Sequence, residues 1–164
     1  MDIKLLRIDS RLVHGQVANN WAGTLGAEAI LAVSDGAAND ELRKTLMLQT
    51  GGGKVKVHVL GVEKAARVYK NPKYAHLKAV IVVETPADIV RLLDLGVKAD
   101  EVNVGGMTFK QGTKALSQAV YISDEDAKAF QEIDKRGITQ YIQQVPSTGR
   151  SDLMSALKSK GFID

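Results

Sequence analysis

The sequence contains no cysteine, which excludes disulfides, thiolate metal sites and cysteine nucleophiles. Aromatic residues make up 5% of its 164 residues, too few for the base-stacking surface of a single-stranded nucleic-acid binder. The net charge of +3 comes from lysines and arginines scattered among acids, without the basic block of a nucleic-acid arm. With only three dispersed histidines, a transition-metal site is not expected either. We therefore expect no nucleic-acid partner, no metal and no cofactor.

Long hydrophobic runs are also missing. No apolar stretch approaches the roughly 18 to 20 residues that span a bilayer, and residues 1–5 lack the apolar core and cleavage site of a signal peptide. The chain shows no internal repeat and no linker. These features predict one soluble, cytoplasmic domain covering residues 1–164, without a fused partner domain.

Short β-branched runs recur along the chain and predict strands of a mostly parallel sheet. The run at 79–83 is continuously apolar, as expected for a strand buried on both faces. The residues between 105 and 117 form a glycine-containing loop without a crossover helix, so we expect the next strand to run antiparallel. The predicted strands are Ile3–Ile8, Ala29–Ser34, Val55–Leu60, Ala79–Glu84, Glu101–Val104, Gln118–Ile122 and Thr139–Gln144.

Helical segments with recognisable ends separate these strands. Thr85 and Pro86 start a helix that closes at Gly96, and Ser123 starts another that closes at Gly137. Further helices are expected from Asn39 or Asp40 to Gln49, around Val17–Trp21, and from Ser151 through Leu157. The alternation of strands and helices predicts an α/β fold with helices on both faces of a central sheet of seven strands.

The loop after the first strand is the strongest candidate for chemistry. In an open α/β sheet, ligands bind beyond the carboxyl ends of the strands, where this loop places His14, Arg11 and Asp9 before a helix. Free N–H groups at a helix start bind anions, an arginine can clamp a phosphate, and Gly15 permits a close approach. A neutral histidine is a competent nucleophile. The loop therefore suits phosphate, although a lone loop histidine is more often an ordinary surface residue.

Other apparent motifs do not support a function. His58 lies in an alternating strand and His76 in a polar loop, so both are expected to be solvent-facing or structural. The segment at 51–54, Gly-Gly-Gly-Lys, lacks the hydroxyl residue of a phosphate-binding loop and precedes a strand, so we interpret it as a flexible turn. Asp124, Glu125 and Asp126 fit the first turn of a helix, where the helix dipole favours acids.

The segment at 7–17, Arg-Ile-Asp-Ser-Arg-Leu-Val-His-Gly-Gln-Val, closely resembles the signature of the IIB component of the mannose/fructose/sorbose family of bacterial sugar phosphotransferase systems. The resemblance covers essentially the whole chain, because further segments agree in order and spacing. These are 33–35 (Val-Ser-Asp), 43–46 (Arg-Lys-Thr-Leu), 71–74 (Asn-Pro-Lys-Tyr) and 102–107 (Val-Asn-Val-Gly-Gly-Met), with Phe109 and Gly112 beyond.

The resemblance implies a three-layer α/β/α sandwich and a protein-Nπ-phosphohistidine–sugar phosphotransferase. In this family the residue matching His14 takes a phosphoryl group, on the δ nitrogen of its ring, from a phosphohistidine of the IIA protein. It then passes the group to a sugar that the membrane IIC and IID components carry in. The resemblance also implies peripheral association with that permease and a capacity to self-associate. Neither the sugar nor the IIA partner is identified by the sequence.

The resemblance also assigns roles to neighbouring residues. Arg11 would stabilise the transferred charge, Asp9 would orient Arg11 or the loop backbone, and Gly15 and Gln16 would begin the helix that supplies N–H donors. Ser10 stands where many family members carry a second acid, which leaves this loop less negative. Two further expectations concern nearby loops. Ser34 and Asp35 would line the same edge of the sheet. The loop from Gly105 through Gly106 and Met107 to Phe109 would approach the site or a partner, unless it only forms a turn.

Two alternatives remain open at this point. The chain could be a regulatory module whose His14 loop holds a phosphate or an acidic partner without chemistry. It could also be a small-molecule enzyme acting on a phosphorylated sugar, although the paired acid and base groups of such an enzyme are missing.

Overall fold

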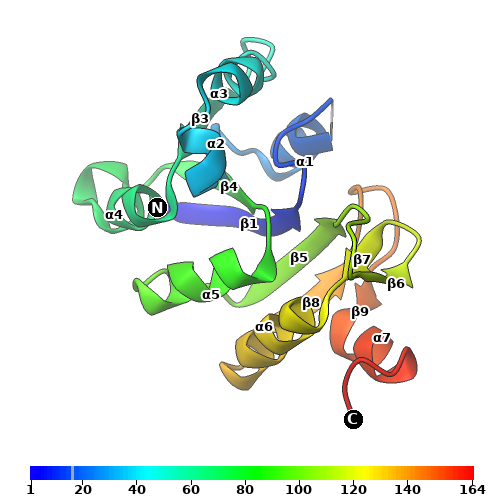
Figure 1. Ribbon diagram of the computed structural model, residues 1–164. Coiled ribbons are helices and arrows are strands. Elements are labelled where there is room, and N and C mark those ends of the chain that lie inside the picture. The colour runs from blue at the N-terminus through cyan, green and yellow to red at the C-terminus, as the bar shows by residue number, and fades with distance from the viewer. Residues whose placement is uncertain (16) are drawn as a thin grey trace.

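A computed structural model describes residues 1–15 and 17–164. Its centre is a seven-stranded sheet in the order β3-β2-β4-β1-β5-β8-β9, parallel throughout except for β9, which runs antiparallel to β8 (Figure 1). The strands are β1 (Asp2–Asp9), β2 (Ala29–Val33), β3 (Lys56–Leu60), β4 (Lys78–Val83), β5 (Glu101–Gly106), β8 (Thr139–Ile142) and β9 (Ser151–Asp152).

Strand β1 lies in the middle of the sheet between β4 and β5. Ile8 is in register with Val83 of β4 and with Val104 of β5, and all three are fully buried. Because the strands are parallel, their carboxyl ends meet at one edge of the sheet. The loop that follows Asp9 therefore begins at the centre of that edge.

Helices cover both faces of the sheet, which confirms the predicted three-layer α/β/α architecture (Figure 1). One face packs against α1 (Val17–Leu25), α2 (Asp35–Ala38) and α3 (Glu41–Leu48). The other packs against α4 (Val62–Lys70), α5 (Pro86–Asp94), α6 (Asp124–Lys135) and α7 (Leu153–Ser159). A short 3₁₀ helix, η1 (Pro72–Tyr74), follows α4.

The expected helix boundaries agree with the capping chemistry of the sequence. The Thr85 hydroxyl accepts a hydrogen bond from the N–H of Asp88, and Ser123 forms a capping box with Asp126. Gly96 and Gly137 follow the ends of α5 and α6 with φ of +98° and +78°, a left-handed conformation that favours glycine.

Two parts of the sequence prediction are wrong. The segment Gln118–Ile122 does not join the central sheet, because β7 (Val120–Ile122) pairs antiparallel with β6 (Lys114–Ser117) in a separate hairpin. The seventh strand of the sheet is instead β9, at the start of the segment expected to be wholly helical. Ser151 and Asp152 pair with β8, and Asp152 then caps α7, so the helix begins at Leu153.

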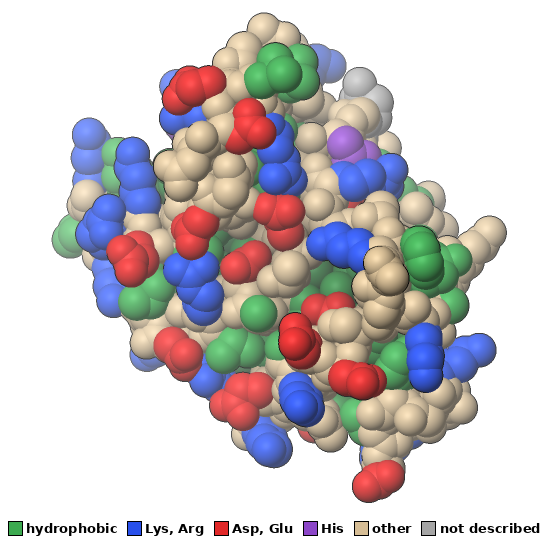
Figure 2. Space-filling view, in the orientation of Figure 1, with side chains coloured by type: hydrophobic (Ala, Val, Ile, Leu, Met, Phe, Trp, Pro, Cys, Tyr) green, Lys and Arg blue, Asp and Glu red, His purple; other side chains and the backbone are tan. Residues whose placement is uncertain are grey.

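Within the described ranges, no helix is both long and apolar enough to cross a bilayer. On the face shown in Figure 2, basic and acidic side chains are intermixed rather than sorted into separate fields. The absence of a nucleic-acid partner remains a prediction.

Candidate functional site

His14 lies in the loop between β1 and α1, at the carboxyl edge of the sheet. Its imidazole Nε2 is 3.2 Å from Oδ2 of Asp9, the last residue of β1. The side chain of Asp9 is only 2% exposed, whereas that of His14 is 24% exposed. A buried carboxylate thus holds one ring nitrogen of an imidazole that solvent reaches.

Asp9 organises the loop through three hydrogen bonds. Oδ2 accepts from His14 and from Nη2 of Arg7 at 3.2 Å, and Oδ1 accepts from the backbone N–H of Arg11 at 3.1 Å. The sequence left open whether Asp9 holds the Arg11 side chain or the loop backbone, and the structure shows the backbone. Asp9 pairs with the Arg7 guanidinium, and the Arg11 side chain is exposed.

The loop turns through two left-handed residues, Leu12 with φ of +57° and Gly15 with φ of +48°. Leu12 is 2% exposed, so burial of its side chain holds a conformation that is unfavourable for leucine. The expectation that Gly15 begins the helix is wrong, because a left-handed residue cannot belong to a right-handed helix. Helix α1 begins at Val17, and Gln16 lies outside the described residues.

The loop after β5 lies against the His14 loop. The Ser10 N–H donates to the carbonyl of Gly106 at 2.9 Å, and the Ser10 hydroxyl accepts from the N–H of Thr108 at 2.9 Å. Met107 is buried in the core, whereas Phe109 is 66% exposed and makes an edge contact with Tyr121. The backbone of this second loop thus supports the site, while Phe109 faces outward.

Ser34 and Asp35 lie at the same edge of the sheet, but neither contacts His14 among the described hydrogen bonds. Ser34 caps α2 and donates to Glu84, which follows β4 and also pairs with Arg43. Asp35 instead accepts from the N–H of Val62 at 2.9 Å and pairs with Arg91 at 2.8 Å. The hydrogen bond from Val62, and then Arg91, lower the pKa of the Asp35 carboxyl.

The other features discounted in the sequence have structural roles. His58 is an exposed residue of β3 and His76 is exposed in the loop after η1. Residues 51–54 form a turn before β3. Among residues 1–15 and 17–164, no three His, Cys, Asp or Glu side chains are grouped to hold a metal ion.

Sequence reasoning missed Arg7. Its side chain is buried beside the site, with the guanidinium 5.7 Å from the ring centroid of Trp21. Burial lowers the pKa of Arg7, and the charge of Asp9 and its hydrogen bond oppose that effect. The available signal was an arginine in an apolar strand, two residues before Asp9 and so on the same face.

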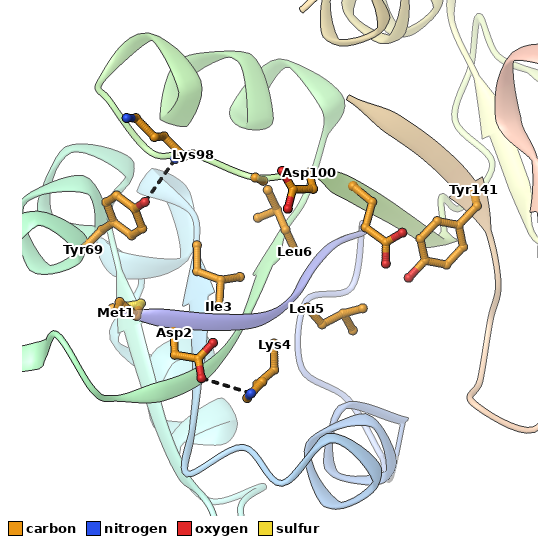
Figure 3. Close-up of a pocket in the computed structure, with 12 residues that line it drawn as sticks. Met1, Asp2, Ile3, Lys4, Leu5, Leu6, Tyr69, Lys98, Asp100 and Tyr141 are labelled. Atoms are coloured by element: carbon orange, nitrogen blue, oxygen red, sulfur yellow. Dashed lines mark hydrogen bonds and ion pairs between the residues drawn. The ribbon is translucent and has the colours of Figure 1, made fainter. Parts of the chain in front are cut away.

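A cleft of about 520 Å³ is lined by the first residues of β1, at the opposite end of that strand from the His14 loop. Figure 3 shows Asp2, Lys4 and Tyr69 among the residues around it. Asp2 and Lys4 there pair with each other at 3.0 Å, and the Lys98 N–H donates to the Tyr69 hydroxyl. The cleft lies at the amino ends of the strands, not at the edge where α/β sheets hold ligands. The His14 loop is therefore the better candidate.

Comparison with known proteins identifies the family of this chain. The family described as "PTS system sorbose subfamily IIB component" matches residues 3–164. The fructose-specific EIIB component of Bacillus subtilis is 36% identical over 97% of this chain and 98% of its own length. The mannose-specific EIIAB component of Escherichia coli is 41% identical over 96% of this chain, which spans 49% of that relative.

A solved structure shows the same fold. The IIB domain of the sorbose permease from Klebsiella pneumoniae superposes with a TM-score of 0.95 at 35% identity, over 99% of this chain and all of that one. IIB components act as phosphocarriers in sugar uptake. From the matched family, these relatives and this superposition, the chain belongs to the sorbose-subfamily IIB components of the sugar phosphotransferase system.

Proposed function

We propose that this IIB component carries the phosphoryl group on His14, receiving it from a phosphohistidine of a IIA protein and passing it to a sugar. The observation that carries the proposal is the partly exposed His14 imidazole held through Nε2 by the buried carboxylate of Asp9. A carboxylate can only accept, so Nε2 carries the proton in this arrangement. The lone pair of the neutral ring is then on Nδ1, which is the proposed nucleophile.

Transfer on this proposal is an in-line exchange between two imidazoles. The Nδ1 lone pair of His14 forms a bond to phosphorus as the phosphorus–nitrogen bond of the donor histidine breaks, and the donor ring keeps that electron pair. The Nε2 proton stays on His14, where the ring becomes more cationic and Asp9 stabilises it. Phosphoryl transfer depends mainly on positioning and charge stabilisation. The exposed Arg11 guanidinium would supply the latter, together with the N-terminus of α1, whose first turn carries no acid.

The partners follow from the family. A IIA protein would be the donor, in line with the name of the Escherichia coli relative, an EIIAB component. The acceptor would be a sugar delivered by IIC and IID permease components, with the protein bound peripherally at the membrane during transfer. Its relatives are named for fructose, mannose and sorbose. The exposed Phe109 beside the site is a suitable contact for one of these proteins.

The test is intact-mass measurement after incubation with phosphoenolpyruvate, the two general phosphotransferase proteins and a cognate IIA protein, at mildly alkaline pH. Wild type and the matched control His58→Ala, which removes an exposed histidine far from the loop, should each gain one acid-labile phosphoryl group. His14→Ala should gain none. Phosphorylation of His14→Ala would reject the assignment. If the IIA protein is phosphorylated but wild type is not, the result would favour a module that binds phosphate without transferring it.

A further inference from the structure

A buried guanidinium lies directly beneath the His14 loop. Arg7 is 1% exposed, and Nη2 donates to Oδ2 of Asp9, the same oxygen that holds His14. Nη1 donates to Oδ1 of Asn103 at 2.7 Å and to the carbonyl of Gln143 at 3.2 Å. Both terminal nitrogens of the planar guanidinium are therefore hydrogen-bonded. Nη1 is held by β5 and by the segment after β8, and Nη2 is held by Asp9.

The neighbouring chain is shaped to admit this side chain. A Cβ at Gly105 of β5 would overlap the Arg7 guanidinium, so only glycine leaves room for it. Trp21 of α1 covers the guanidinium, and the Trp21 Nε1–H donates to the carbonyl of Gln144 at 3.2 Å. Two strands, the segment after β8 and one helix thus fix a single charge.

Stability alone is a weak reason for such an arrangement. Replacing a buried ion pair by apolar residues is often neutral or stabilising. Two of the three groups that contact Asp9, the Arg7 guanidinium and the Arg11 N–H, can only donate, and His14 Nε2 donates as well when Asp9 is a carboxylate. Arginine is the one side chain that keeps its positive charge when buried, and a fixed cation favours an ionised neighbour.

We propose that Arg7 is a positioning residue for phosphoryl transfer with two effects. It keeps Asp9 an ionised acceptor, which holds the His14 proton on Nε2, and it offsets the negative charge of Asp9, which leaves the His14 ring neutral with its lone pair on Nδ1. This proposal rests on the phosphocarrier function above. The compensating charge matters because an unpaired buried carboxylate would draw a second proton onto His14, and an imidazolium has no lone pair to attack phosphorus. Among the described residues, the charged and titratable groups that act on the Arg7–Asp9 pair are Arg11 in the loop and Tyr141 of β8, and the Trp21, Asn103 and Gln143 groups that contact Arg7 are neutral.

The test begins with ¹⁵N NMR of the His14 ring in the free protein at pH about 7.5, which separates the neutral Nε2–H ring, the neutral Nδ1–H ring and the imidazolium. Wild type should show the neutral Nε2–H pattern. Arg7→Met should show the imidazolium pattern. Arg7→Lys should restore the wild-type pattern, even though one ammonium cannot replace both terminal nitrogens of the guanidinium. Arg43→Met is the matched control, because Arg43 pairs with Glu84 at the same edge of the sheet, and it should leave the pattern unchanged.

The rate of phosphoryl transfer from a phosphorylated IIA protein is the second measurement. Arg7→Met should be at least about tenfold slower than wild type at neutral pH, and raising the assay pH should recover much of the loss by removing the extra proton. A structural role alone would give a loss that pH does not recover. If Arg7→Met does not fold, Arg7→Gln carries the test, because glutamine keeps polar donors in the buried site but removes the positive charge, and it should show the imidazolium pattern.

An unchanged ring pattern in Arg7→Met, or an equal loss of rate at every pH, would overturn the proposal. The ring pattern needs no phosphorylation. It therefore separates failure of this proposal from failure of the carrier function, which would instead leave wild type unphosphorylated.

Discussion

Replacing Gly105 by alanine is expected to destabilise the protein strongly, because the new methyl group would occupy the space of the Arg7 guanidinium. The neighbouring Gly106 provides a matched control in the same strand. A Cβ at Gly106 would meet nothing closer than 3.8 Å, an ordinary contact, and neither glycine is among those with positive φ. The two substitutions therefore differ in one respect, the displacement of Arg7.

The magnitude follows from the bonds that Arg7 would lose. Its guanidinium donates to Asp9, Asn103 and the Gln143 carbonyl, all buried. Breaking a buried ion pair by displacing one partner costs roughly 3–5 kcal/mol, and this range includes the hydrogen bonds because their losses are not additive. Gly106→Ala should instead be neutral or stabilising by up to about 1 kcal/mol, because alanine restricts the unfolded chain more than glycine does.

Urea unfolding followed by far-ultraviolet circular dichroism measures both variants against wild type. Gly105→Ala should unfold at a markedly lower urea concentration with an unchanged slope, whereas Gly106→Ala should unfold at or above the wild-type midpoint. Equal midpoints for the two variants would refute the reasoning, because they would mean that the guanidinium moves aside at no cost.

Two further predictions concern charged side chains. Arg11→Ala should slow phosphoryl transfer roughly 10²-fold while leaving the melting temperature nearly unchanged, because the side chain is exposed; parallel losses of rate and of melting temperature would count against its role. Asp35→Asn should be less stable than wild type near pH 7, and the two should converge as pH falls. Folding lowers the pKa of Asp35 below its ordinary value of 3.8. The ionised carboxyl therefore contributes its full stabilisation to the folded state above this ordinary pKa, and the stabilisation is lost as pH falls through the lower pKa of the folded state. Urea midpoints measured from about pH 7 to about pH 3 check this, and a difference constant over that range would contradict it.

Much of the fold could be predicted because local signals and the sheet agree. The apolar run at 79–83 is a central buried strand, and Thr85 and Ser123 cap helices as expected. The wrong assignment of Gln118–Ile122 has a physical cause. A hairpin strand and a sheet strand have the same alternation of side chains, and what distinguishes them is a distant partner, here Lys114–Ser117.

The site residues also differ in how far the sequence could predict them. His14 and Arg11 could be proposed from the sequence because they are close together, within one loop of specific composition. Arg7 was missed because an arginine in a strand usually lies at the surface, and its partners Asn103 and Gln143 are about 96 and 136 residues away. The role of Asp9 as the partner of His14, rather than of the Arg11 side chain, depends on the left-handed turn at Leu12, which the sequence does not signal.

The central claim is that His14 carries the phosphoryl group on Nδ1 while Asp9 holds Nε2. The most direct measurement is NMR of the ¹⁵N-labelled, phosphorylated protein, recording which ring nitrogen couples to phosphorus. The account predicts phosphorus on Nδ1 of His14, with a proton on Nε2. Phosphorus on Nε2, or on any residue other than His14, would contradict it.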